Sequence, residues 1–169
     1  MMRFLLLLIS AAGAFSQTTD PEPAAILEFG ASTAHDFSGG WNLGPSVAVE
    51  FTPIEDRLEI ETGVTAAFRR HAMEWDTDLL FKKPWTISEK FEFMLGIGPE
   101  WVHARSRGVV TNSPGIEFAP DLMFWPSGHR FGWYLEPSYD RTFGSGRGQS
   151  IGITAGLLIA IPRPGRLTN

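Results

Sequence analysis

The segment LEIETGVTAAFR, residues 58–69, alternates between apolar side chains and polar or small ones. Successive side chains of a β-strand point to opposite faces, so this alternation predicts a strand with two different surfaces. The apolar face carries Leu58, Ile60, Thr62, Val64, Ala66 and Phe68. The opposite face carries Glu59, Glu61, Gly63, Thr65, Ala67 and Arg69. The segment therefore predicts a strand that separates an apolar environment from a polar one.

The same period of two returns along the chain, with turn residues between the segments. Seven further segments show it: 91–101, 131–140 and 151–161 clearly, 27–29, 47–51 and 116–124 over shorter lengths, and 76–82 most weakly. The 18 Gly and 12 Pro residues are too dense for long helices. We therefore expect an all-β chain of eight strands.

The N-terminus has the composition of a secretory signal peptide. Arg3 supplies a positive charge, residues 4–9 are apolar, and Ala14 and Ser16 are small residues where a signal peptidase would cleave. An uncleaved anchor is the alternative, but the apolar run is short for a membrane span. We predict a signal peptide at 1–16, a polar leader at 17–24, a barrel at 25–161 and a tail at 162–169.

Composition narrows the class of protein further. The chain has no cysteine, so an exported form relies on burial or on a membrane for stability. The net charge of −5 argues against nucleic acid as a partner. After the signal peptide no apolar run is long enough for a transmembrane helix, so a membrane-spanning chain would have to cross as strands.

The connecting segments suggest a topology. The links at 53–57, 84–89 and 126–130 are short, whereas those at 35–44 and 104–114 are longer and richer in Gly, Ser and charge. Such an alternation is typical of up-and-down outer-membrane barrels, with both termini on the periplasmic side. Tryptophan near the strand ends is typical of the membrane interface, and we assign four residues to it: Trp75, Trp85, Trp101 and Trp125.

Alternation alone does not show which face meets water, because a soluble lipocalin-like barrel alternates with its apolar face inward. Here the apolar faces are nearly free of charge, the other faces mix small residues with carboxylates, and lysine is scarce. These features favour an eight-stranded antiparallel up-and-down transmembrane β-barrel with its apolar face outward.

The chain resembles the small outer-membrane β-barrel proteins of the OmpA and OmpX type in architecture over residues 24–161, and uncharacterised members over 131–162. The last strand contains Thr154, Gly156, Ile159 and Ile161 in the spacing of the family's assembly signal, but lacks its terminal aromatic residue and continues into a tail. The resemblance implies a Gram-negative outer-membrane location and no particular activity. We expect a monomer whose partners are membrane lipids, lipopolysaccharide among them.

An outward apolar face places many carboxylates in the lumen. The candidate lumen polar cluster comprises Glu100, Asp121, Glu136, Glu92, Glu59, Glu61, Asp140 and Arg69. Other acids expected inside are Glu28, Glu50 and Glu117, and the other bases are Lys82 and Arg141.

Three of these acids adjoin a proline within a strand, namely Glu100, Asp121 and Glu136. If the antiparallel pairs are centred on the 126–130 turn and the 104–114 loop, all three acids lie at one height in the barrel. We therefore expect them to form one hydrogen-bonded cluster. Neighbouring carboxylates need compensation by a base, a proton, or a bound cation or polar ligand. We favour a structural network that fills a narrow lumen.

Other candidate chemistry is weaker. The four histidines match no metal-binding spacing, and we expect no metal site and no cofactor. His35 and Ser38 could form a Ser-His-carboxylate set with a nearby acid, on proximity alone. The Gly-rich segment 144–148 lacks the lysine of a phosphate-binding loop. Arg105 and Arg107 could meet lipopolysaccharide phosphates.

The sequence therefore leaves three functions open. The first is a non-enzymatic barrel with a structural or envelope-associated role. The second is an envelope lipid-modifying enzyme of the lipid A deacylase or acyltransferase type. The third is a soluble periplasmic lipid-binding barrel.

Overall fold

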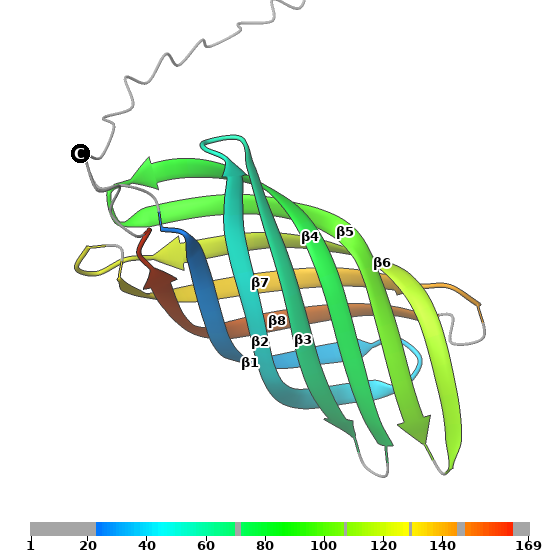
Figure 1. Cartoon of the computed structure of the whole chain (residues 1–169). Helices are drawn as coiled ribbons and strands as arrows, with labels where there is room; N and C mark the ends of the chain where they lie inside the picture. The colour runs from blue at the N-terminus through cyan, green and yellow to red at the C-terminus, as the bar shows by residue number, and fades with distance from the viewer. Residues whose placement is uncertain (1–22, 70–71, 107, 129, 145–147, 164–169) are drawn as a thin grey trace, which may run out of the picture.

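The computed structural model describes residues 23–69, 72–106, 108–128, 130–144 and 148–163. These residues form a closed antiparallel barrel (Figure 1). Its eight strands are β1 (Ala25–Asp36), β2 (Gly40–Ile54), β3 (Leu58–Arg69), β4 (Ala72–Ser88), β5 (Phe91–Ser106), β6 (Val109–Phe124), β7 (Phe131–Thr142) and β8 (Gly148–Ile161).

Each strand pairs with its neighbours in sequence, and β1 closes the barrel by pairing with β8 from Ala25–Ile161 to Asp36–Ser150. The expected eight-stranded up-and-down barrel is therefore confirmed. The described residues contain no helix long and apolar enough to cross a membrane. The predicted signal peptide and most of the predicted leader lie outside the described residues.

The first and last strands define the two ends of the barrel. Ala25 and Ile161 lie together at what we call the terminal end, and Asp36 and Gly148 lie at what we call the open end (Figure 1).

The prediction of long loops at the open end is wrong, because most of the residues assigned to those loops belong to strands. β1 and β2 are joined by residues 37–39 alone, and β5 and β6 by residues 107–108. A glycine allows each tight turn, since Gly40 and Gly108 both have positive φ angles. At the terminal end the connections are residues 55–57, 89–90 and 125–130, so loop length does not distinguish the two ends.

The strand expected at 76–82 is also longer than predicted. β4 is the longest strand, with 17 residues, and includes the 84–88 segment that we had expected to be a turn. Its inward residues are Glu74, Asp76 and Asp78, and they alternate with outward Trp75, Thr77 and Leu79. The period of two is therefore present, but the inward side chains are charged and not small.

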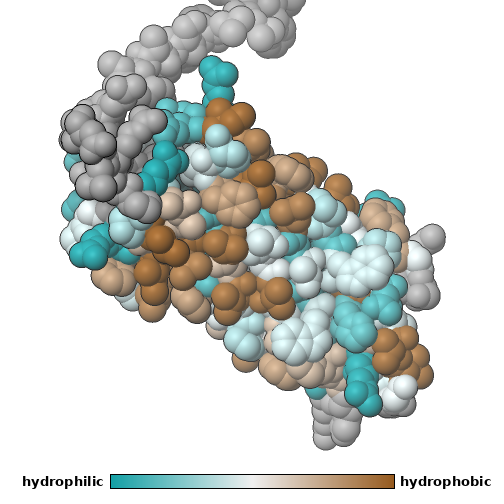
Figure 2. All heavy atoms as spheres, viewed as in Figure 1, coloured by the Kyte–Doolittle hydropathy of each residue, from teal (hydrophilic) through white to brown (hydrophobic). Residues whose placement is uncertain are grey.

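The apolar face of every strand points outward, as expected. Large exposed side chains occur along the whole wall, for example Phe29, Val47, Ile97 and Leu157. Figure 2 shows hydrophobic side chains gathered over the strands on the face in view. The inward side chains include a core of buried acidic residues, which reverses the arrangement of a water-soluble barrel.

Two residues differ from their expected placement. Trp125 is 2% exposed and packs inside the terminal end, because it continues the inward parity of Ala119, Asp121 and Met123 beyond β6. Arg141 points outward, where its guanidinium lies against the ring of Phe143. Arg141 therefore does not compensate the lumen carboxylates.

Candidate functional site

An apolar layer closes the interior at the terminal end. Its buried residues come from both ends of the chain and from the middle strands: Ile26, Met94, Met123, Trp125, Tyr134, Leu158 and Ala160. Water and ions do not readily cross such a packed layer. The terminal end is thus a floor, on which the polar part of the interior rests.

Lys82 lies immediately above this floor and is fully buried. Its Nζ lies 2.6 Å from Glu136 Oε2, 3.1 Å from Asp121 Oδ2 and 3.8 Å from Glu50 Oε2, and it also forms an ion pair with Glu61. We call these five residues the Lys82 network. They come from β2, β3, β4, β6 and β7, so one ammonium group connects strands on opposite sides of the barrel.

The backbone makes room for this side chain. Gly96 pairs with Lys82 on the neighbouring strand, and a Cβ at Gly96 would lie 3.0 Å from Lys82 Cγ. A larger residue on β5 would therefore displace the lysine stem. The small residue is what allows the long side chain to extend across the lumen.

Negative charge exceeds positive charge at this level. Besides the Lys82 network, Glu28 is 1% exposed and Glu59 pairs directly with Lys82 across β3 and β4. Six carboxylates thus lie close to one ammonium group. Glu50 and Glu61 are direct cross-strand partners on the inner face, a placement that is unfavourable for two like charges.

Several of these carboxylate oxygens have no hydrogen-bond donor. They include Glu28 Oε1 and Asp121 Oδ1, whereas the carboxyl group of Glu50 is hydrogen-bonded to that of Glu59. Ligand atoms of Glu28, Glu50, Glu61 and Asp121 all lie within 4.8 Å of one another. We call these four residues the carboxylate cluster.

A cavity of about 330 Å³ lies above the network and extends to the open end. Glu28, Glu61 and Glu136 line its lower part. Its walls carry six further acids, Glu74, Asp76, Asp78, Glu100, Glu117 and Asp140, and its mouth carries Asp36. Serines and threonines, with Asn42 and Gln149, supply most of the remaining polar lining, and Ala34, Ala48, Val102 and Ala104 lie among them. The cavity is therefore mainly polar and strongly acidic.

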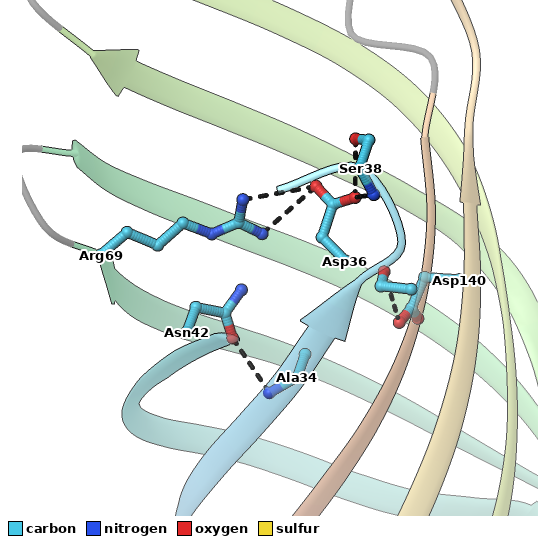
Figure 3. A network of polar contacts seen from close by, with 7 residues as sticks. Ala34, Asp36, Ser38, Asn42, Arg69 and Asp140 are labelled. Atoms are coloured by element: carbon cyan, nitrogen blue, oxygen red, sulfur yellow. Dashed lines mark hydrogen bonds and ion pairs between the residues drawn. The ribbon is translucent and has the colours of Figure 1, made fainter. Parts of the chain in front are cut away.

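The mouth of the cavity contains an ion pair. Arg69 Nη2 lies 3.3 Å from Asp36 Oδ2, and the Ser38 backbone N–H and hydroxyl donate to Asp36 Oδ1 at 2.7 and 2.8 Å (Figure 3). Nearby, the Ala34 N–H donates to Asn42 Oδ1. These contacts fix the short β1–β2 connection beside the opening. Among the described residues, Arg69 is the base that lines the cavity at its mouth.

The expected single cluster of Glu100, Asp121 and Glu136 is only partly assembled. The β6–β7 register pairs Leu122 with Leu135, which places Asp121 opposite Glu136 as predicted. Asp121 instead pairs with Met94 of β5, six residues before Glu100. The β5–β6 turn lies at 107–108, before the middle of the loop we had expected, and this moves Glu100 toward the open end.

The other members of the predicted lumen cluster are distributed along the barrel axis. Glu59 and Glu61 lie beside Lys82, Asp140 lies in the cavity wall, and Glu92 lies near the terminal end. Asp140 accepts hydrogen bonds from the hydroxyls of Ser138 and Ser150. Arg69 lies at the mouth, and Glu100 projects over Gly115, whose missing Cβ leaves space for its carboxylate.

Sequence reasoning did not identify Lys82 as the centre of the network, nor Glu28 and Glu50 as members of the deepest layer. The signal that could have found Lys82 is its position in β4, where it continues the inward parity of Asp76, Asp78 and Leu80. It is the one lysine on this face of the described strands.

The proposed Ser-His-carboxylate set does not assemble. His35 points outward and its ring lies edge-on to Phe37 and Trp41, with ring centroids 5.9 and 4.9 Å away. Ser38 instead donates its hydroxyl to Asp36 at the mouth of the cavity. His71, Arg107, His129 and the middle of the 144–148 segment lie outside the described residues.

No protein-family model matches the chain, and no curated protein matches it in sequence. Solved structures do match, each over 82% of this chain. Neisserial surface protein A aligns with a TM-score of 0.68 and 12% identity over 97% of its own chain. Ail, the attachment invasion locus protein of Yersinia pestis, solved with the heparin analogue sucrose octasulfate, aligns with a TM-score of 0.60 and 10% identity over 99%. The N-terminal barrel domain of Pseudomonas aeruginosa OprF gives 0.56 and 14% over 100%.

The fold is that of the small outer-membrane barrels. The resemblance to the OmpA and OmpX type is therefore confirmed for the architecture. At 10–14% identity these matches show the fold alone.

Proposed function

We propose that this chain is an exported outer-membrane protein of a Gram-negative envelope, with a structural or envelope-associated role and a closed lumen. The observation that carries the proposal is the polarity of the wall. Large apolar side chains cover the outside of all eight strands, whereas the inside holds Lys82 and many carboxylates. In water this arrangement would expose apolar surface and bury charge, both at a cost. In a bilayer the same arrangement is favourable.

The outer surface supports this location in a second way. Exposed aromatic residues occur toward the open end at Trp41, Trp75 and Trp101, and toward the terminal end at Trp85 and Trp133. Amphipathic aromatic rings favour the two membrane–water interfaces. Between them the outward residues are mainly Val, Ile, Leu and Phe.

The interior argues against a soluble lipid carrier. Such a barrel would need an apolar cavity for an acyl chain. The cavity here is lined mainly by acids, serines and threonines, and the large apolar side chains inside pack against one another as a floor. Membrane lipids are therefore proposed as partners of the outer wall, with lipopolysaccharide at the open end, where Arg105 is exposed.

Fractionation tests the location. The full chain, expressed with its own N-terminus in a Gram-negative host, is expected in the outer-membrane fraction after an alkaline wash. It is also expected to migrate faster on a denaturing gel before boiling than after it, because a closed barrel resists unfolding by detergent at room temperature. Recovery in the soluble periplasmic fraction would contradict the proposal.

A further inference from the structure

We infer that the carboxylate cluster, Glu28, Glu50, Glu61 and Asp121, is a binding site for a divalent cation of the size of Ca²⁺. The site lies at the bottom of the acidic cavity, beside Lys82. It depends on the interior of the closed barrel and not on the membrane, so it can be tested separately from the proposed location.

The geometry of the cluster fits such an ion. Its ligand oxygens lie within 4.8 Å of one another. Oxygen ligands on opposite sides of a bound Ca²⁺ are separated by about 4.6–5.2 Å, since each Ca–O distance is about 2.3–2.6 Å. Mg²⁺ binds at about 2.0–2.1 Å, demands a near-ideal octahedron and dehydrates reluctantly, so a site made of protein carboxylates favours Ca²⁺. Ligands that are all carboxylate oxygens favour a hard cation over a transition metal.

The unpaired oxygens are a second, independent observation. Glu28 is 1% exposed, yet its Oε1 accepts no hydrogen bond. Asp121 is 0% exposed, and its Oδ1 is likewise buried without a donor. A buried carboxylate without a partner is costly, so most are paired or coordinate a metal. These side chains converge on one point, where a single cation would serve all of them.

Lys82 does not fill this role by itself. Its ammonium contacts Asp121 through Oδ2, which leaves Oδ1 free, and its distance to Glu50 Oε2 is 3.8 Å, beyond hydrogen-bond range. Its close contacts are with Glu61, Asp121 and Glu136, and Glu28 Oε1 is left without a donor. Six carboxylates around one ammonium leave enough negative charge for a dication next to it.

The cavity provides the route to the site. Glu28 and Glu61 belong both to the cluster and to the lower lining of the cavity. Above them, acids such as Asp78, Glu100 and Asp140 continue toward the open end. A lining of one charge sign concentrates counter-ions in a cleft. A cation entering from the open end would therefore be drawn down to the carboxylate cluster.

Equilibrium dialysis with radioactive Ca²⁺ tests the inference. The purified full chain in detergent micelles, stripped with a chelator, is expected to bind one Ca²⁺ saturably, with Mg²⁺ competing weakly. E50Q and D121N are expected to weaken binding by about tenfold or more, because each removes a charged ligand. E55Q is the matched control, since Glu55 lies exposed in the β2–β3 connection.

Folding of each variant is checked by its gel migration before and after boiling. In a folded wild-type barrel, Ca²⁺ should also raise the thermal unfolding temperature, and this rise should be absent in folded E50Q. Two results would overturn the inference: no saturable Ca²⁺ binding to the folded wild type, or equal Ca²⁺ affinity in wild type, E50Q and D121N. Either would mean that protons alone offset the buried carboxylates.

Discussion

Lys82 is the residue whose substitution is expected to lower the stability of the barrel most. It is fully buried and lies within 4 Å of four carboxylates from four other strands. A buried ion pair is a weak source of net stability, because desolvation offsets much of the attraction. Removing one partner is different, since it leaves the opposite charge buried and uncompensated.

Lys82→Met is expected to destabilise the barrel by about 3–5 kcal/mol at neutral pH, the range for breaking a buried ion pair. The measurement is urea unfolding of the refolded chain in detergent or lipid. Lys83→Met is the control, because Lys83 is the next residue and lies on the other face, near Trp85. We expect a change below about 1 kcal/mol there. Equal losses in the two variants would show that the network does not carry this stability.

At this scale the sequence could predict the direction of most side chains but not their partners. The period of two predicts an inward direction for Glu59, Glu61 and Asp140, and these three side chains are buried in the structure. It also predicts that Asp121 and Glu136 lie at the same height in the barrel, because the 126–130 turn lies midway between them in the β6–β7 pair. Contacts across the lumen depend on closure and on strand tilt, and neither is encoded locally. For that reason the position of Lys82 among its four acids could not be predicted.

At the scale of strands, the hairpin of β5 and β6 shows how a turn sets the height of a residue. The expected loop at 104–114 is mostly strand, and the connection is only 107–108, with Gly108 at a φ of 83°. Gly, Ser and Asn residues in a segment favour a loop on composition, whereas pairing with a long neighbour extends the strand. The displacement of Glu100 relative to Asp121 follows directly from this difference.

The β4–β5 pair gives a prediction for this scale. At Gly98 a Cβ would overlap the backbone carbonyl of Leu79, whereas at Gly96 it would lie 3.0 Å from the flexible Lys82 stem. Gly98→Ala should therefore force two paired strands apart and cost about 1–3 kcal/mol, the range for overpacking. Gly96→Ala, two residues away on the same face, should cost clearly less. Urea unfolding of both variants provides the comparison, and a larger loss for Gly96→Ala would show that the strands do not approach as closely as described.

At the scale of the whole molecule, arginine substitutions on the outer wall test the membrane proposal through their effect on the free energy of unfolding. Val47 lies half-way along β2, faces outward, and pairs with Phe29 and Val64. Val47→Arg is expected to cost about 2–4 kcal/mol in lipid vesicles, because the charge would lie near the bilayer midplane. Ile54→Arg, at the exposed end of the same strand, should cost about 0–1 kcal/mol. Similar small effects at both positions would mean that the wall faces water.

The packed interior also predicts transport behaviour. The apolar floor at the terminal end and the Lys82 network above it leave no continuous aqueous path through the described residues. An eight-stranded barrel has an interior that side chains can fill. In planar lipid bilayers the purified chain should therefore show no steady ionic conductance above background. Reproducible conductance steps from the folded wild type would contradict a closed lumen.

The span of the Lys82 network has a consequence for assembly. Glu50 lies on β2 and Glu136 on β7, and in an unrolled sheet five strand spacings would separate them by about 24 Å. Lys82 can meet both only after β1 has joined β8. Closure of the seam therefore completes the neutralisation of the interior, because an unclosed sheet keeps only the contacts of Lys82 with Glu59 and Glu61 on the neighbouring β3. The charges on β2, β6 and β7 should stay hydrated until the last edge is sealed.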